Sequence, residues 1–399
     1  IRDTSVTGVQ TCALPIYMKY NILLIAFFLF INFSCAQDLK PLDEENDSSI
    51  LIEETNYEME LVFEDENIIW SIEFINENSI LAAVKSGSIF KYNDGVKTEI
   101  KGVPEIYLRG QGGLLDIALH PNFSENNLIY ISYASGSRDA GGGNTTISRA
   151  KLINNELVDL EVLYQGTPNT TKGVHFGGRM VFDDNNHLYF SIGDRGNRDK
   201  NPQDISLDGG KIYRINDDGS IPDDNPFIND LNAIKAIYSY GHRNPQGIFK
   251  NPDTGEIWTN EHGPRGGDEI NIIKKGVNYG WPKITYGINY SGTTITKDKE
   301  LPGMAQPLYY WLPSIAPSSF EYISSDVYPG WKGSMLAGAL VFKYVERIGV
   351  ENDKVIYRSK IAEGLGRPRD IKQGPDGYIY VALEKKGVYK IVPKRVMPK

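Results

Sequence analysis

The chain has 399 residues, a formal net charge of −9 and 40% hydrophobic residues, with 40 glycines and 24 tyrosines. This length can bury a large core, in two ordinary domains or in one large all-β domain. The acidic balance argues against a nucleic-acid partner, which requires a basic face, and against electrostatic adhesion to anionic membranes.

The amino-terminal part has the pattern of a secretion leader. Residues 1–17 precede Met18 and are interpreted as a non-native translated prefix, so they are excluded from the fold. Met18 and Lys19 open a segment with an apolar run at 22–33, shorter than the about 20 residues that a membrane-spanning helix needs. We therefore predict a bacterial signal peptide over residues 18–36.

Cysteine usage also bears on the destination of the protein. Cys12 and Cys35 are its only cysteines, and Cys12 lies in the prefix, so no disulfide is expected in the folded part. Cys35 follows the apolar run and resembles a lipoprotein acceptor, so lipidation at Cys35 and cleavage near Ala36 both stay open. Cleavage near Ala36 predicts a periplasmic protein, and lipidation at Cys35 predicts an outer-membrane-anchored lipoprotein. In both cases the acidic residues 37–56 are expected to form a solvated tether.

From residue 57 to residue 399 the pattern is one of short strands. Runs of four to six residues rich in Ile, Tyr, Phe and Val alternate with Gly, Asn and Asp, as in "NHLYFSIGDRG" and "GYIYVALEKKGVYKIV". Similar units recur along the chain without a long amphipathic helix. This indicates an all-β fold, and we predict a six-bladed β-propeller of four-stranded antiparallel blades.

Five polar, glycine-rich stretches interrupt the strand pattern. Each alone is typical of a blade-end turn, which is also what we expect for His120 and His187. Together they contribute one His, one Gln, one Asp and three Arg to one end of the predicted propeller. The stretches are residues 107–123 with Gln111, 173–196 with His175 and Asp194, 238–249 with Arg243 and Asn244, 260–282 with His262, Asp268, Glu269 and Tyr279, and 364–371 with Arg367 and Arg369.

The residue types in these stretches suggest the ligands. Arg367 and Arg369 alternate, so on a strand both guanidinium groups point to one side, and with Arg243 they favour an anionic ligand. Asp268, Glu269 and nearby backbone carbonyls suit a hard cation such as Ca²⁺. No Cys or His cluster suits zinc or iron, and no glycine-rich loop leads into a helix as nucleotide cofactors require.

The stretches "GQGGLLDIALHPNF", "YGHRNPQGI" and "NEHGPRGGDEINIIKKGVNYGWP" resemble the soluble quinoprotein glucose/sorbosone dehydrogenase family, especially its aldose sugar dehydrogenase branch. The resemblance covers nearly all of residues 60–393. Members are six-bladed propellers that bind pyrroloquinoline quinone (PQQ) and Ca²⁺. The resemblance thus implies both cofactors, an aldose substrate and an electron acceptor of unspecified identity.

The resemblance also implies roles for individual residues. His175 is the expected base, Asp194 its orienting carboxylate and Gln111 a substrate-side group. The residues expected around PQQ are Arg243, Asn244, His262, Asp268, Ser314, Arg367 and Arg369, and those expected around calcium are Gly263 and Pro264 at one site and Glu269 and Tyr279 at another.

One position departs from the family pattern. Where members usually carry a PQQ-contacting lysine, this chain has Val341 in "LAGALVFKYV". Lys343 lies two residues further on, so it is expected on the same face of an extended strand and is a candidate replacement.

The function that the sequence supports best is oxidation of the C1 hydroxyl of an aldose to a lactone, with His175 as general base and Arg243 and Ca²⁺ polarising the quinone. Two alternatives stay open, a non-catalytic carbohydrate- or protein-binding propeller and a calcium-dependent propeller lactonase. The binding propeller has no need for His175 paired with Asp194, and the lactonase has no need for the arginine cluster.

Overall fold

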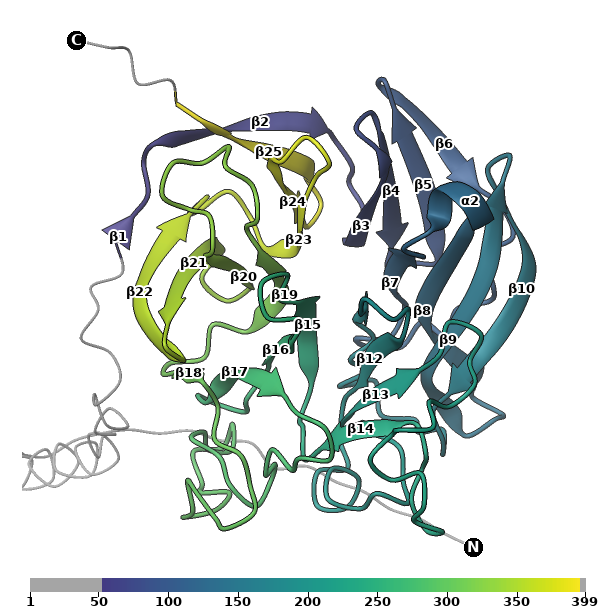
Figure 1. The fold of residues 1–399 in the computed structure, drawn as a ribbon, viewed down its shortest axis with the longest axis vertical. Helices are drawn as coiled ribbons and strands as arrows, with labels where there is room; N and C mark the ends of the chain where they lie inside the picture. Colours follow the sequence, from purple (N-terminus) through teal and green to yellow (C-terminus); the bar gives the residue numbers. More distant parts are fainter. Residues whose placement is uncertain (1–51, 395–399) are drawn as a thin grey trace, which may run out of the picture. The chain divides into compact units, whose positions relative to one another are not determined.

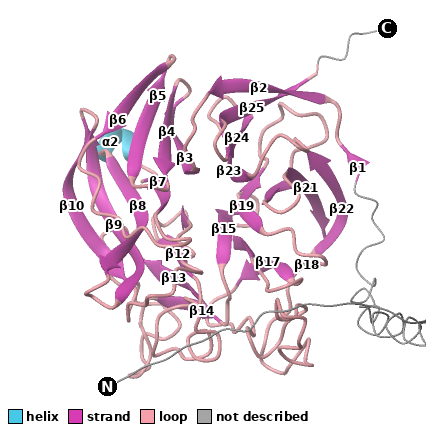
Figure 2. Cartoon of the chain, turned by 180° about the vertical axis from the view of Figure 1, so that it is seen from behind, coloured by secondary structure: helices cyan, strands magenta, loops and turns pink. Residues whose placement is uncertain are grey.

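The computed structural model describes residues 52–394. The prefix, the predicted signal peptide, Cys35 and most of the predicted tether lie outside the described residues. The described part is almost entirely strand and loop, with a single short helix, α2 (Phe123–Asn126) (Figure 2). Within residues 52–394 no helix is long and apolar enough to cross a membrane.

The strands form six sheets, which confirms the predicted six-bladed propeller (Figure 1). The first three blades each contain four consecutive antiparallel strands. They comprise β3 (Ile69–Asn76), β4 (Ser79–Val84), β5 (Ser88–Asn93) and β6 (Val96–Ile100); β7 (Leu114–Leu119), β8 (Leu128–Ser137), β9 (Gly142–Ile153) and β10 (Glu156–Gln165); and β11 (Met180–Phe182), β12 (Leu188–Ile192), β13 (Lys211–Ile215) and β14 (Ile237–Tyr240).

The other three blades follow in chain order. They comprise β15 (Pro245–Lys250), β16 (Ile257–Glu261), β17 (Asp268–Ile273) and β18 (Tyr309–Trp311); β19 (Pro317–Tyr322), β20 (Met335–Ala339), β21 (Tyr344–Glu351) and β22 (Lys354–Ile361); and β23 (Pro368–Gln373), β24 (Ile379–Leu383) and β25 (Gly387–Pro393) with β2 (Tyr57–Phe63). The first strand of each blade contacts the first strands of the two neighbouring blades, so these six strands form a closed inner ring.

The two ends of the folded part close the ring. β2 pairs with β25 and completes the last blade, and β23 of that blade contacts β3 of the first blade. β1 (Ile52–Glu53) also pairs with β22, in parallel. Glu54 then accepts hydrogen bonds from Arg347 and Ser359, so residues expected in the tether contact the propeller.

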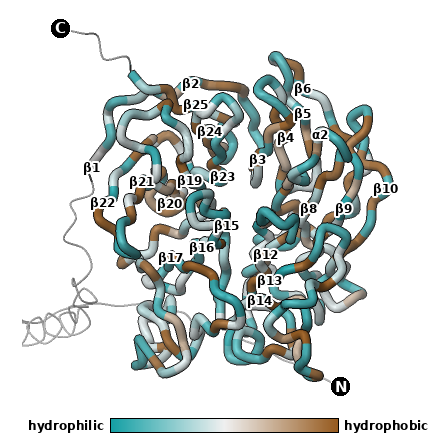
Figure 3. Tube along the Cα trace, viewed as in Figure 1, coloured by the Kyte–Doolittle hydropathy of each residue, from teal (hydrophilic) through white to brown (hydrophobic). Residues whose placement is uncertain are grey.

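The core lies between adjacent blades. Hydrophobic and hydrophilic stretches alternate along the trace, in strands as well as in loops (Figure 3). Between the fourth and fifth blades, for example, Trp258, Trp311 and Phe320 are almost fully buried and pack in one cluster. Burying each such side chain contributes about 1.5–3 kcal/mol, which explains why aromatic strand residues hold neighbouring blades together.

Polar side chains cross-link the inner ring near its axis. Arg179, the residue before β11, pairs with Asp116 of β7 at 3.3 Å and with Asp370 of β23 at 2.9 Å. Asp370 also accepts hydrogen bonds from the Ile72 amide of β3 and the Ser319 hydroxyl of β19. All of these residues are buried, so each charge depends on its partners for the solvation it has lost.

Replacing Arg179 with methionine should therefore destabilise the protein by about 3–5 kcal/mol, because Asp116 and Asp370 would stay buried without their cation. Urea unfolding measures the difference. The matched control is Lys332→Met, which breaks the exposed pair with Asp326 and should cost less than about 1 kcal/mol. Equal losses in the two variants would contradict a central role for Arg179.

Candidate active site

His175 lies in the loop between β10 and β11 and forms a close pair with Asp194. Its Nδ1 is 2.6 Å from Oδ1 of Asp194, and its backbone N–H donates to Oε1 of Gln111 at 2.6 Å. The φ of His175 is +54°, in the left-handed region that non-glycine residues rarely adopt. Because Nδ1–H donates to Asp194, the acceptor nitrogen of the neutral imidazole is Nε2.

Asp194 follows β12, and hydrogen bonds engage both of its carboxylate oxygens and its backbone N–H. Its Oδ1 also accepts the Gly196 N–H, and its Oδ2 accepts the indole N–H of Trp281 at 2.9 Å. Its own N–H donates to the Arg243 carbonyl at 2.7 Å. A carboxylate that is 1% exposed and bound by these donors can orient His175 without rotating.

Burial and charge set the protonation of this pair. Burial lowers the pKa of His175, and although Asp194 acts in the opposite direction, the positive charge of Arg243 lowers the pKa further. Burial alone would raise the pKa of Asp194, but the hydrogen bonds from His175 and Trp281 and the charge of Arg243 hold it below its ordinary value. The pair therefore rests as neutral imidazole beside carboxylate, the state in which a histidine can accept a proton.

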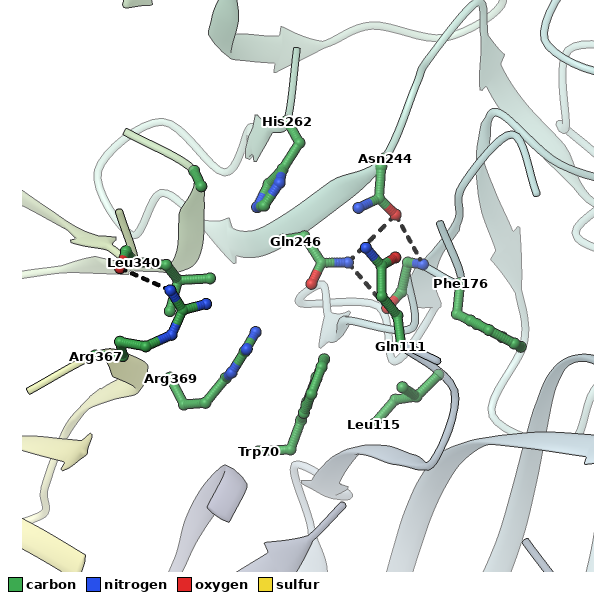
Figure 4. A pocket seen from close by; sticks show the side chains of 12 residues that line it. Trp70, Gln111, Leu115, Phe176, Asn244, Gln246, His262, Leu340, Arg367 and Arg369 are labelled. Atoms are coloured by element: carbon green, nitrogen blue, oxygen red, sulfur yellow. Dashed lines mark hydrogen bonds between the residues drawn. The ribbon is translucent and has the colours of Figure 1, made fainter. Parts of the chain in front are cut away.

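A cavity of about 120 Å³ adjoins the pair (Figure 4). Gln111, Phe176, Gly177 and Asn244, which neighbour His175, form one part of its lining. Figure 4 shows the other part, where the arginines of the last blade point toward the cavity. The remaining lining residues are Trp70, Leu115, Gln246, His262, Ala316 and Leu340.

Arg179 positions three of the lining residues through their backbones. Its guanidinium donates to the carbonyls of Trp70, Gln246 and Arg369, each at 3.0 Å. These residues belong to three different blades. The axial ion network and the cavity lining are therefore one continuous structure.

Arg367 and Arg369 lie side by side, as their alternation predicted. Both Nε atoms donate to the carboxylate of Glu384, at 3.0 and 2.7 Å. Arg367 also donates to the Leu340 carbonyl, and the Arg369 guanidinium lies 4.1 Å from the centre of the Trp70 ring. Two guanidinium groups against one carboxylate leave a net positive charge at the cavity, which suits an anionic ligand.

Arg243 and Asn244 form hydrogen bonds with the segments that carry His175 and His262. The Arg243 guanidinium donates to the His262 carbonyl at 2.9 Å, and the Asn244 side-chain oxygen accepts from the Gly177 amide. The Asn244 nitrogen points toward the cavity (Figure 4). Burial, and then the charge of Arg243, lowers the pKa of His262 to about 3, so His262 is neutral and its Nε2–H donates to a backbone carbonyl.

Asp268 and Ser314 bond to each other and do not line the cavity. Asp268 accepts the Ser314 hydroxyl and the Gly263 and Ala316 amides, at 2.7–3.0 Å. It thereby holds the turn around Gly263 and Pro264. Within residues 52–394 no hydrogen bond occupies the carbonyls of Gly263 and Pro264, so both oxygens remain available to a cation such as Ca²⁺.

Glu269 lies opposite Glu261 on neighbouring strands, away from the cavity lining. Burial, and then the Glu261 carboxylate, raises the pKa of Glu269 well above its ordinary value. Glu261 is buried and Glu269 is half-buried, and two adjacent carboxyl groups can share a cation. The Tyr279 hydroxyl, by contrast, is engaged with the Ile272 carbonyl and the Lys274 amide. In the described part of the chain no three His, Cys, Asp or Glu side chains are grouped for metal binding.

The expectation of an extended strand at Lys343 is wrong. β20 ends at Ala339 and β21 begins at Tyr344, so Val341 and Lys343 lie in a tight turn. Lys343 has a φ of +60° and is exposed, and it does not share a strand face with Val341. The spacing argument for Lys343 as a replacement lysine therefore fails.

Four residues of the site were not predicted from the sequence. Trp70 carries no local signal, since it is one aromatic residue in an ordinary strand. Glu384 likewise follows a strand without any distinguishing neighbour. Gln246 and Trp281 could have been found, because they lie within "RNPQG" and "NYGWP", two stretches already singled out.

The family model "Glucose / Sorbosone dehydrogenase" matches residues 66–390. The chain is 39% identical to Aldose sugar dehydrogenase YliI of Escherichia coli, over 82% of this chain and 90% of that protein. It is 29% identical to Quinoprotein glucose dehydrogenase B of Acinetobacter calcoaceticus, over 90% and 89% of the two chains.

Solved structures agree with these similarities. The apo-form soluble aldose sugar dehydrogenase of Escherichia coli superposes with a TM-score of 0.80 at 37% identity, covering 84% of this chain and 99% of that one. The PQQ-bound form of Aldose Sugar Dehydrogenase from Streptomyces coelicolor has a TM-score of 0.70 at 24% identity, with 85% and 99% covered. At 24% identity, the similarity to the Streptomyces coelicolor structure supports the fold alone.

The electrostatics of the pair can be tested by NMR titration of the histidine rings. His175 should titrate below its ordinary value of 6.5. Asp194→Asn should lower this pKa further, because it removes the carboxylate that favours the imidazolium, whereas Arg243→Met should raise it. Shifts of the same sign in both variants would contradict this arrangement.

Proposed function

The chain belongs to the glucose/sorbosone dehydrogenase family, and on this premise we propose that it is a PQQ- and calcium-dependent aldose sugar dehydrogenase that converts the C1 hydroxyl of an aldose to a lactone. The family and its relatives support a sugar-oxidising enzyme. One observation supports the assignment of PQQ and of a base at the sugar C1 hydroxyl. A neutral histidine–carboxylate pair adjoins one part of the cavity lining, and two arginines held by one carboxylate form another.

The cavity lining fits PQQ, a planar quinone that carries carboxylate groups. Arg367 and Arg369 offer guanidinium N–H groups to carboxylates, Trp70 offers a flat apolar surface, and the Asn244 side chain offers an amide donor. When bound, PQQ supplies the two-electron acceptor that alcohol oxidation needs and that no side chain provides. The word quinoprotein in the name of the Acinetobacter relative supports this assignment.

His175 provides the base for the reaction. Its Nε2 accepts the proton of the sugar C1 hydroxyl, and Asp194 stabilises the imidazolium that forms. Bound PQQ would supply the acceptor for the C1 hydride. Gln111 keeps the His175 backbone in its unusual conformation and belongs to the cavity lining, so it can also orient the sugar. Burial, and then the charge of Arg243, keeps His175 neutral before the reaction. Arg243 would also stabilise negative charge that develops on the quinone oxygen.

Calcium would be held beside the cavity by backbone oxygens. The carbonyls of Gly263 and Pro264 follow the cavity-lining His262, and Asp268 fixes their turn. A bound calcium ion supplies Lewis-acid polarisation there. Glu269, with the neighbouring Glu261, is the proposed location of a second calcium ion, with the Tyr279 segment nearby.

The two alternatives receive less support. A binding propeller needs no His175 with a strained backbone that is paired with a buried Asp194. A calcium-dependent lactonase needs a carboxylate-lined metal site, whereas the described part of this cavity is lined by arginine, amide and apolar side chains. Export through the leader at residues 18–36 and lipidation at Cys35 stay predictions, since both lie outside the described residues.

Reconstitution tests the proposal. Purified apoprotein should reduce an electron-accepting dye with an aldose only when PQQ and Ca²⁺ are both added, and a calcium chelator should abolish this activity. Oxidation of the sugar with NAD and without PQQ would overturn the cofactor assignment. Activity limited to lactone hydrolysis would favour the lactonase instead.

Replacing His175 with glutamine should lower kcat by about 10²- to 10⁴-fold, because glutamine cannot take the proton. In the unsubstituted enzyme kcat/KM should hold through pH 6.5 and fall only at lower pH, because the imidazole stays neutral until its lowered pKa is reached. The matched control is His187→Gln, which alters a second histidine–aspartate pair remote from the cavity lining and should leave kcat unchanged. Near-normal kcat in His175→Gln would show that the proton goes elsewhere.

A further inference from the structure

A second cavity, here called the basic groove, borders the same site. It has a volume of about 410 Å³ and extends over the start of the first blade and the turn between β24 and β25. No role proposed above uses it. Its lining residues are Glu66, Asn67, Ile68, Val84, Lys85, Ser86, Leu108, Arg109, Gly110, Gly112 and Lys385.

The basic groove and the catalytic cavity share one loop. Gln111 lines the catalytic cavity, while its neighbours Gly110 and Gly112 line the groove. The same loop packs on the segment that carries His175. The Arg109 side chain donates to the Thr171 carbonyl at 2.6 Å, and the Gln111 amide donates to the Gly173 carbonyl at 2.8 Å. A ligand in the groove therefore lies one loop away from the proposed base.

The groove is positively charged although the chain as a whole carries −9. Its lining contains Lys85, Arg109 and Lys385 against the single acid Glu66. The Lys85 amino group lies 5.7 Å from the Trp70 ring, the same ring that Arg369 contacts in the catalytic cavity. Trp70 thus has cations from both cavities against it.

Apolar side chains complete the lining. Ile68, Val84 and Leu108 lie among the cations, and the Leu108 side chain is 56% exposed. A carbohydrate ring presents both C–H faces and polar edges, so a lining of apolar and cationic groups suits a sugar that carries an acid. Lys85 and Arg109 donate to the carbonyls of Gly110 and Thr171, which are neutral, so an anionic group on the sugar would offer these cations a charged partner that a neutral sugar lacks.

We propose that the basic groove is a second sugar subsite, which binds an anionic group, carboxylate or phosphate, on the unit next to the sugar being oxidised. This inference rests on the proposed function. It specifies the substrate class as acidic disaccharides or longer acidic oligosaccharides with a free reducing end. The reducing unit lies with its C1 hydroxyl at His175, and the acidic unit extends past Gln111 into the groove.

The test compares three disaccharides that share a reducing glucose unit, with the PQQ- and Ca²⁺-loaded enzyme. One has a neutral second unit, one a uronate and one a phosphorylated hexose. The kcat/KM of an acidic disaccharide should exceed that of the neutral one by about five- to tenfold at low salt, and salt should reduce the ratio. The uronate and phosphate arms identify which anion is preferred.

The variant Lys385→Gln should reduce this ratio, and Lys385→Glu should invert it. Because both substrates are measured on one preparation, any change in folding or cofactor loading cancels in the ratio. The matched control is Lys386→Gln, since Lys386 is the next residue but donates to the Leu365 carbonyl and does not line the groove. Calorimetric titration of the acidic disaccharide into the protein, without dye, provides a readout independent of turnover.

The outcomes separate the two proposals. If no aldose is oxidised, the proposed function fails first. If the neutral disaccharide is oxidised and the acidic ones gain no advantage, the subsite alone is refuted. A salt effect that appears with an anionic dye and plain glucose, with no change in the disaccharide ratio, would instead place the electron acceptor in the groove and overturn the subsite.

Discussion

The buried guanidinium of Arg179 connects the fold to the site. It pairs with Asp116 and Asp370 on two inner strands, and Asp370 joins two more through Ile72 and Ser319. Burial raises the pKa of Asp116 to about 6 against the opposing effect of the Arg179 charge, which indicates how much desolvation these groups have undergone. The network is stabilising only when the inner strands are positioned so that these charged groups meet, so it favours a single packing of the blades.

The same guanidinium determines where the cavity lining stands. The carbonyls of Trp70, Gln246 and Arg369 all accept hydrogen bonds from it. The backbones that carry the Trp70 ring and the Arg369 guanidinium are therefore fixed relative to the central ion network. The Arg369 side chain is then oriented by Glu384. Rigid support of this kind keeps binding groups in place before the ligand arrives, which lowers the entropy lost on binding.

The candidate base is supported differently, by a loop held in an unfavourable conformation. His175 keeps a positive φ because Gln111 binds its amide and Asp194 binds its ring. The neighbouring Arg195 contributes too. Its guanidinium lies 3.4 Å from the centre of the Phe176 ring and donates to the carbonyl of Lys172. Strain that the surroundings maintain in this way is common where a side chain must be aimed at a reacting atom.

The sequence by itself determined the strands, the class of fold and the identity of the chemical groups. Strand pattern and turn residues are local properties, so the strands could be predicted from the sequence. The candidate site residues could also be predicted, because they lie in short recognisable stretches, as do His175, Gln111, Arg367 and Arg369. The tertiary structure alone decided which groups meet. Glu384 orients Arg367 from 17 residues away and Trp281 supports Asp194 from 87 residues away, and neither partnership leaves a mark in the local pattern. Lys343 illustrates the same limit, because a tight turn after Ala339 reversed the chain where strand periodicity would have continued. The basic groove, too, exists only because ring closure brings Lys385 beside Lys85, 300 residues apart in a chain whose overall charge is negative.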